Sequence, residues 1–208
     1  AEALMDLHPW DLWERTGEPK AWTPEIVGII EGILKKNPNH PQACHLYIHA
    51  TEASGNPERA LPYANSLRTL VKGSGHLVHM PSHTYINTGH YHDGTLVNEW
   101  ASQRDSNYVE ACHDAGVYPL VYYPHNLHFL AACAALEGNG KKSLRAARYM
   151  AEHVVNKELM RLPDLATLQH YLSIPWFIQV KFADWDEILK EPMPAADFLS
   201  DVESIRIM

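Results

Sequence analysis

Seven of the fourteen histidines in this chain of 208 residues fall in three short strings. The strings read His45-Leu46-Tyr47-Ile48-His49, His76-Leu77-Val78-His79-Met80-Pro81-Ser82-His83 and His125-Asn126-Leu127-His128. Neutral imidazole is the commonest ligand that proteins offer to transition metals. A helix turns by about 100° per residue, so histidines three or four positions apart share one face. Each string therefore predicts a row of metal ligands on one helix.

Helices joined by short breaks must position these strings. The apolar periodicity and the breaking residues predict four helical repeats, at 23–54 with 56–72, 76–89 with 91–110, 124–138 with 140–156, and 164–182 with 184–190. Thr23 is the expected N-cap of the first helix, and Pro24 then takes the N1 position. Few segments alternate apolar and polar residues with period two, so we expect an all-α chain with almost no sheet.

The repeats share a register when they are aligned on the residue that breaks each of them. The breaking residues are Gly55, Gly89, Gly138 and, by position, Ala183. Five positions after the break stand Ala60, Gly94, Ser143 and Ile188, of which the first three are small, as close helix packing requires. Ten positions before it stand His45, His79, His128 and Ser173, and thirteen before it Gln42, His76, His125 and His170. Pro81 and Pro175 share the column eight before it, where each should bend its helix.

The offset between His45 and His79 is 34 residues, the period of the tetratricopeptide (TPR) helix–turn–helix repeat. The helix openings Asn56-Pro57-Glu58-Arg59-Ala60-Leu61 and Gly89-His90-Tyr91 resemble those of TPR second helices. Pro9-Trp10-Asp11-Leu12-Trp13, His45-x-Tyr47-Ile48-His49-Ala50-x-Glu52 and the string from His76 to Tyr85 resemble a group of bacterial TPR-containing proteins of uncharacterised function. The resemblance implies a single TPR-like α-solenoid over 1–208, a right-handed α-α superhelix whose first helices line the concave face. It supplies no reaction.

In such a stack the first helices lie side by side, about 9–10 Å apart. Imidazoles that reach in from two helices can then meet one ion at about 2.0–2.1 Å. The predicted ligands are His45, His49, His79 and His83, with His76, His125 and His128 at the edge of the cluster. A structural network of histidine–carboxylate and histidine–carbonyl bonds is the alternative. Glu52 or Asn126 is expected to orient a ligating ring through its other nitrogen, or Glu52 to act as a catalytic base.

These ligands favour a metal-binding solenoid, with copper, iron, zinc or nickel as the ion, that acts as an enzyme on a small molecule. A metal store or carrier without catalysis would use the same site. A TPR module that captures a peptide or protein partner in its groove without metal is the competing hypothesis. Tyr47 and Tyr85 flank the strings, and ordinary helix packing is the simpler interpretation of both.

Composition sets the outer bounds. The net charge is −8 with histidine neutral, and the absence of any Lys/Arg run argues against a nucleic-acid-binding protein. No apolar stretch approaches the ~20 residues that span a bilayer, so we expect a soluble protein, cytoplasmic or periplasmic. Cys44, Cys112 and Cys133 form no CxxC pair and are expected to be buried thiols. The chain starts as though inside a helix and stops at Met208 without a cap, which suggests a fragment of a longer protein.

Overall fold

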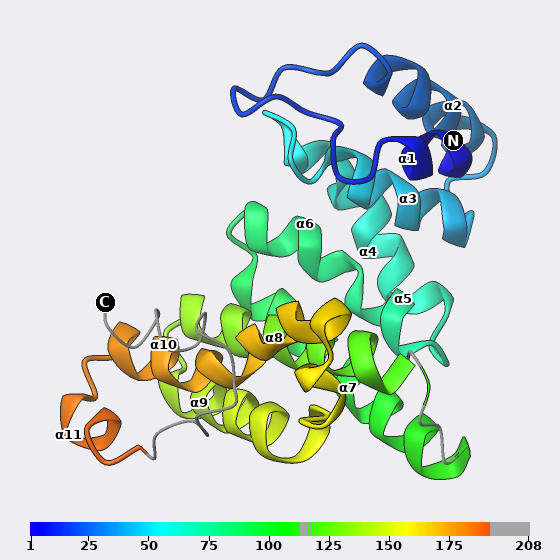
Figure 1. The fold of residues 1–208 in the computed structure, drawn as a ribbon. Coiled ribbons are helices and arrows are strands. Elements are labelled where there is room, and N and C mark those ends of the chain that lie inside the picture. Colours follow the sequence, from blue (N-terminus) through cyan, green and yellow to red (C-terminus); the bar gives the residue numbers. More distant parts are fainter. Residues whose placement is uncertain (113–115, 117, 192–208) are drawn as a thin grey trace. The chain divides into compact units, whose positions relative to one another are not determined.

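The computed structural model describes residues 1–112, 116 and 118–191, and helices make up most of that part of the chain (Figure 1). The described residues form no β-strand, and an isolated bridge joins Trp13 to Pro19. The all-α prediction is confirmed. None of the described helices is long and apolar enough to cross a lipid bilayer.

The chain divides into two compact units, an N-terminal unit Ala1–Ala101 and a C-terminal unit that begins at Ser102. Helix α7 (Tyr91–Cys112) contains the boundary. The single continuous solenoid that the TPR resemblance implies stays a prediction.

The N-terminal unit is a stack of short helices. Its elements are α1 (Glu2–Leu7), α2 (Thr23–Lys36), α3 (Pro41–Thr51), a 3₁₀ turn (Pro57–Ala60), α4 (Leu61–Leu70), α5 (Gly75–His79), α6 (Pro81–Asn87) and the first part of α7. Helix α2 packs against α3, α3 against α4, and α4 against α5 and α6. Ile26, Ile30, Ile48 and Leu67 are fully buried in the core between them.

Two local predictions in this unit turn out differently. Thr23 is not the N-cap of α2, because Trp22 holds that position without a side-chain bond and the Thr23 hydroxyl donates to the Leu12 carbonyl. The helix expected over 76–89 is split into α5 and α6 at Met80, because Pro81 has no N–H to continue the first helix. Pro81 therefore interrupts the helix, as expected, but it separates two helices instead of bending one.

The described part of the C-terminal unit, like the N-terminal unit, consists of short helices. Its elements are a π-helical turn (Tyr118–Tyr122), α8 (Tyr123–Leu136), α9 (Gly140–Tyr149), a second π-helical turn (Met150–Val154), 3₁₀ segments (Leu159–Arg161 and Pro163–Ser173), α10 (Ile174–Lys181) and α11 (Trp185–Ile188). Helix α8 packs against α9, α9 against α10, and α10 against α11. The helix expected over 164–182 is a 3₁₀ segment up to Ser173 and becomes an α-helix only with Pro175 in its first turn.

The break between the helices of a repeat has the same geometry in three of the four repeats. Gly89, Gly138 and Ala183 have positive φ angles of 79°, 87° and 56°. The next residue in each case donates its N–H to the carbonyl five positions earlier, at 2.9 Å, 2.8 Å and 2.9 Å. This is the hydrogen bond of a Schellman C-cap. Ala183 is therefore a breaking residue like the two glycines, as its position predicts.

Ala183→Gly is expected to stabilise the C-terminal unit by about 0.5–1 kcal/mol. An L-residue in the left-handed region carries a steric cost that glycine lacks, and this gain exceeds the extra backbone entropy that glycine has in the unfolded chain. Urea unfolding measures the change. Gly138→Ala, at the equivalent cap, should change the free energy of unfolding in the opposite direction; equal signs for the two variants would contradict this account of the cap.

The three thiols do not share one environment. Cys44 and Cys133 are buried as expected, but Cys112 is exposed at the end of α7, so the prediction was wrong for that residue. Burial raises the pKa of Cys44 to about 11 and that of Cys133 to about 12. Both thiols are therefore protonated near neutral pH and are poor metal ligands.

Candidate metal centre

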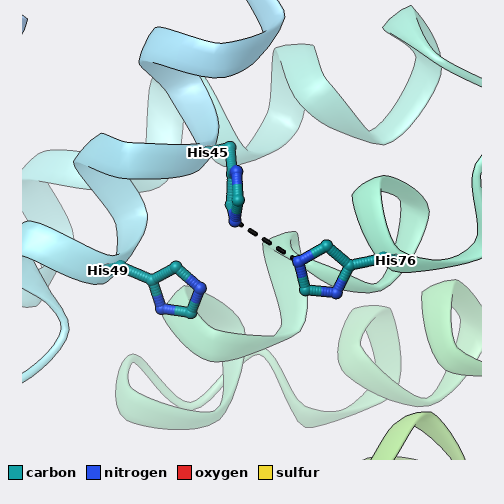
Figure 2. A group of neighbouring side chains, drawn as sticks. All are labelled: His45, His49 and His76. Carbon is teal, nitrogen blue, oxygen red and sulfur yellow. Dashed lines mark hydrogen bonds between the residues drawn. The ribbon is translucent and has the colours of Figure 1, made fainter. Parts of the chain in front are cut away.

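Five imidazoles of the N-terminal unit form a closed circuit that we call the histidine ring. Its members come from α3, α5 and α6, and Figure 2 shows three of them, His45, His49 and His76, facing one another. The distances between ring centroids around the circuit are 5.1 Å for His45–His49, 5.0 Å for His49–His83, 4.9 Å for His83–His79, 6.0 Å for His79–His76 and 5.1 Å for His76–His45. The predicted quartet is thus brought together, and His76 belongs to the circuit instead of its edge.

The N-caps of α3 and α5 fix where these helices begin and so which way their histidines point. His40 caps α3 by accepting from the Ala43 N–H, and one turn of that helix then separates His45 from His49. Ser74 caps α5 by accepting from the Leu77 N–H, so His76 and His79 lie one turn apart.

Glu52 binds two members of the histidine ring at once. Its Oε1 lies 2.8 Å from His49 Nδ1, and its Oε2 lies 2.6 Å from His83 Nδ1. An ionised carboxylate only accepts hydrogen bonds, so both Nδ1 atoms carry the proton and donate. In a neutral imidazole the other nitrogen, Nε2, is then a bare lone pair. Glu52 therefore orients two rings with their Nε2 atoms ready to ligate.

Two side-chain amides do the same for two more rings. Asn98 Oδ1 accepts from His79 Nδ1 at 2.6 Å, and its orientation is fixed because Asn98 Nδ2 donates to the Gly94 carbonyl at 2.8 Å. Gln42 Oε1 lies 3.3 Å from His45 Nδ1, while Gln42 Nε2 donates to Glu2 Oε1 at 3.2 Å. Both rings thus carry their proton on Nδ1 and a lone pair on Nε2.

The Nε2 atoms of four rings meet in two pairs within the circuit. His79 Nε2 lies 3.0 Å from His83 Nε2, and His45 Nε2 lies 3.3 Å from His76 Nε2. Two nitrogens bound to one ion at 2.0–2.1 Å are about 3.3–3.4 Å apart at a tetrahedral angle and about 2.9 Å apart at a right angle. Two facing lone pairs repel unless a cation, either a proton or a metal ion, lies with them. Each pair is at hydrogen-bond distance, drawn for His45 and His76 in Figure 2, and the same spacing fits two nitrogens on one metal ion.

Three or more ligand atoms come together in two overlapping sets within this unit. His45, His49 and His76 form one set, and His49, Glu52 and His83 form the other. Each residue offers one ligand atom, and the atoms of a set lie within 4.8 Å of one another. Nitrogen-rich sets of this kind suit copper, iron, zinc or nickel. The described side chains are thus placed to hold a metal ion.

Burial and hydrogen bonding set the charges of His45 and Glu52 in this site. Burial, helped by repulsion from His49 and His83 when those rings are protonated, lowers the pKa of His45 to about 4. Burial also acts to raise the pKa of Glu52, but the hydrogen bonds from His49 and His83 outweigh it and hold that pKa at about 2. His79 and its partner Asn98 are fully buried. Near neutral pH the site therefore offers a neutral His45 and one carboxylate, as metal binding requires.

In the metal-free protein, acid should weaken folding between pH 6.5 and 4. The unfolded chain protonates His45 near pH 6.5, whereas the folded chain does so only near pH 4, which corresponds to about 3 kcal/mol of lost stability. Burial and the charge of His170 also lower the pKa of His128, in the C-terminal unit, to about 4. His128 therefore adds to the loss of folding stability that the wild type shows as the pH falls. The contribution of Glu52 lies lower, between pH 4.5 and about 2.

Urea titrations at pH 7 and pH 4.5 isolate the part due to His45. The His45→Gln variant should lose less stability on acidification than the wild type, because it has no imidazole to protonate. His153→Gln removes a largely exposed ring and serves as the control. A His45→Gln variant whose pH slope matches the control would show that this ring is not held neutral by its site.

The remaining predicted ligands, His125 and His128, are on α8 in the C-terminal unit. His128 contacts the rings of His170 and Tyr171, at centroid distances of 5.7 Å and 5.8 Å, and His125 contacts Phe129 at 4.9 Å. Asn126, predicted as an orienting residue, instead donates from Nδ2 to Asp105 Oδ2 at 2.6 Å. The orienting amides of the histidine ring are Asn98 and Gln42.

Asn98 was not among the predicted orienting residues, although its position in the repeat distinguishes it. It stands nine residues after the break at Gly89, in the column that Ala64 and Ala147 occupy in the first and third repeats. All three side chains are fully buried. An asparagine in a column of small apolar residues needs a buried hydrogen-bond partner. That requirement points to a function beyond packing.

The two tyrosines beside the strings bond away from the histidine ring. Tyr47 donates its hydroxyl proton to Glu31 Oε1 at 2.8 Å and accepts from Arg59 Nε at 2.8 Å. Tyr85 donates to Asn65 Oδ1 at 2.7 Å. Both therefore fasten neighbouring helices, in agreement with the simpler interpretation.

The fold and the histidine ring together define an all-α protein with side chains placed to hold a metal ion. No protein-family model, no curated protein and no solved structure matches the chain. The likeness to TPR proteins therefore depends on the sequence motifs alone.

Proposed function

We propose that this chain binds a transition-metal ion through the histidine ring, on a scaffold of the TPR-like solenoid type. The proposed ligands are the Nε2 atoms of His45, His49, His79 and His83, together with His76. Copper, iron, zinc and nickel all suit such a set, and affinity order alone does not choose among them.

A single observation carries the proposal. Four rings have Nδ1 against a side-chain oxygen, which directs the Nε2 lone pairs to the interior of the circuit. Binding of the second nitrogen to a carboxylate or carbonyl oxygen is the usual arrangement of metal-ligating histidines. With Nδ1 of both rings bonded to an oxygen, the two Nε2 atoms that face each other at 3.0 Å need a cation between them, and a transition-metal ion can fill that place.

We further propose that the centre acts on a small molecule. A bound ion with an open coordination position supplies Lewis-acid or redox chemistry. Both oxygens of Glu52 accept protons from imidazoles, so its proposed role is to orient His49 and His83 and not to act as a general base. A store or carrier would use the same ligands without turnover.

Elemental analysis of the purified protein tests metal binding. The wild type should hold transition metal in stoichiometric amount, and the His45→Ala/His79→Ala variant should hold none. His90→Ala/His153→Ala, which removes two exposed rings outside the circuit, is the matched control and should retain the metal. Protein that stays metal-free and helical, yet binds peptides, would contradict the proposal and favour a TPR interaction module.

A further inference from the structure

We infer that the histidine ring holds two metal ions, which together bind an oxyanion, either phosphate or carboxylate. This inference depends on the proposed function, because it requires that the ring binds metal at all. It starts from the number of ligands, since five imidazoles and one carboxylate exceed what one four-coordinate ion needs.

The size of the circuit argues against one central ion. Its sides are between 4.9 Å and 6.0 Å long. A flat five-membered circuit of this size has its corners about 4.4 Å from the centre, and a ring nitrogen lies only about 1.1 Å from its centroid, whereas a metal–nitrogen bond is 2.0–2.1 Å. Each of five rings would have to move inward by about 1.2 Å to share one ion. The ion must therefore lie toward one side.

The close nitrogen pairs mark two such sides. His45 Nε2 and His76 Nε2 are 3.3 Å apart, and His49 belongs to the same ligand set. His79 Nε2 and His83 Nε2 are 3.0 Å apart on the other side of the circuit. Each imidazole whose Nδ1 donates to an oxygen can bind one ion only. The first ion is thus assigned to His45, His49 and His76, and the second to His79 and His83.

The charge of such a centre selects the ligand that it would take. Two divalent ions bring four positive charges, the imidazoles bring none, and Glu52 brings one negative charge, which leaves three positive charges. Within the N-terminal unit the second ion has two imidazole ligands, fewer than a four-coordinate ion needs, so oxygen ligands can complete its coordination. In two-metal enzymes, ions about 3.5–4 Å apart together stabilise oxygens of the reacting group. A phosphate or carboxylate group meets both requirements.

Native mass spectrometry of the chain titrated with zinc counts the ions directly. Two zinc ions per chain support the inference. One ion per chain overturns it but leaves the proposed function intact, and none overturns both. His45→Gln/His76→Gln and His79→Gln/His83→Gln, checked for helicity, should each retain one ion, whereas loss of both ions in either variant would indicate a single shared site.

A measurement on the wild type alone avoids any effect of the variants on folding. Two Cu²⁺ ions about 4 Å apart couple their spins, so copper-loaded protein should show a reduced electron paramagnetic resonance signal per copper. Full intensity from isolated ions would contradict the inference. Calorimetric titration of the zinc-loaded protein with inorganic phosphate and with acetate tests the anion: binding of either supports the bridging ligand, and binding of neither overturns that part.

Discussion

Replacing Glu52 by glutamine is expected to weaken zinc binding by about 100-fold or more. Loss of one outer partner of a ligating histidine typically costs 10–100-fold in metal affinity, and Glu52 serves two such rings. The amide also presents a donor to one of the two Nδ1–H groups. That ring must move its proton to Nε2 or turn away, and in both cases a ligand is lost. Competition with a chelator of known affinity measures the change.

Glu31→Gln is the matched control for this experiment. Glu31 is also a glutamate bonded to two side chains, but its partners Tyr47 and Arg59 lie outside the histidine ring. Its replacement should leave the zinc affinity unchanged. Equal affinities for the Glu52→Gln and Glu31→Gln variants would mean that Glu52 does not position metal ligands.

Zinc is expected to slow amide hydrogen exchange in the N-terminal unit and not in the C-terminal unit. A ligand at about 100 times its Kd stabilises the folded state that binds it by about 2.7 kcal/mol, which corresponds to about 100-fold slower exchange through unfolding. The peptides that cover α3, α5 and α6 should show the effect, because these helices carry the five imidazoles.

The helices α8 and α9 provide the internal comparison in the same sample. Helix α8 carries His125 and His128, so protection confined to α8 would place the zinc site in the C-terminal unit and contradict the assignment of the ligands. A chelator added at the end should restore the original exchange rates in α3, α5 and α6.

The sequence predicted the helices well where local signals decide them. The Schellman cap at Ala183 could be assigned by position, because helix-terminating geometry depends on a few neighbouring residues. The exact start of α2 could not, because the Thr23 hydroxyl bonds to the Leu12 carbonyl, a contact eleven residues away. Nor could the 3₁₀ form of the segment Pro163–Ser173, which has apolar residues at a spacing equally typical of an α-helix.

The site could be predicted in part for a similar reason. Helical spacing and the 34-residue offset are enough to bring His45, His49, His79 and His83 together. The place of His76 in the circuit depends on the direction of α5 after the Ser74 cap, and the role of Asn98 depends on packing between helices. Neither follows from one string of sequence.

Diffraction from crystals grown with zinc, recorded at the zinc absorption edge, tests the central claim most directly. We expect anomalous peaks inside the histidine ring, within about 2.0–2.1 Å of Nε2 atoms. The Nδ1 atoms of His49 and His83 should stay on Glu52, and that of His79 on Asn98. Zinc found only outside the circuit, or rings turned so that their Nε2 atoms face protein oxygens, would contradict it.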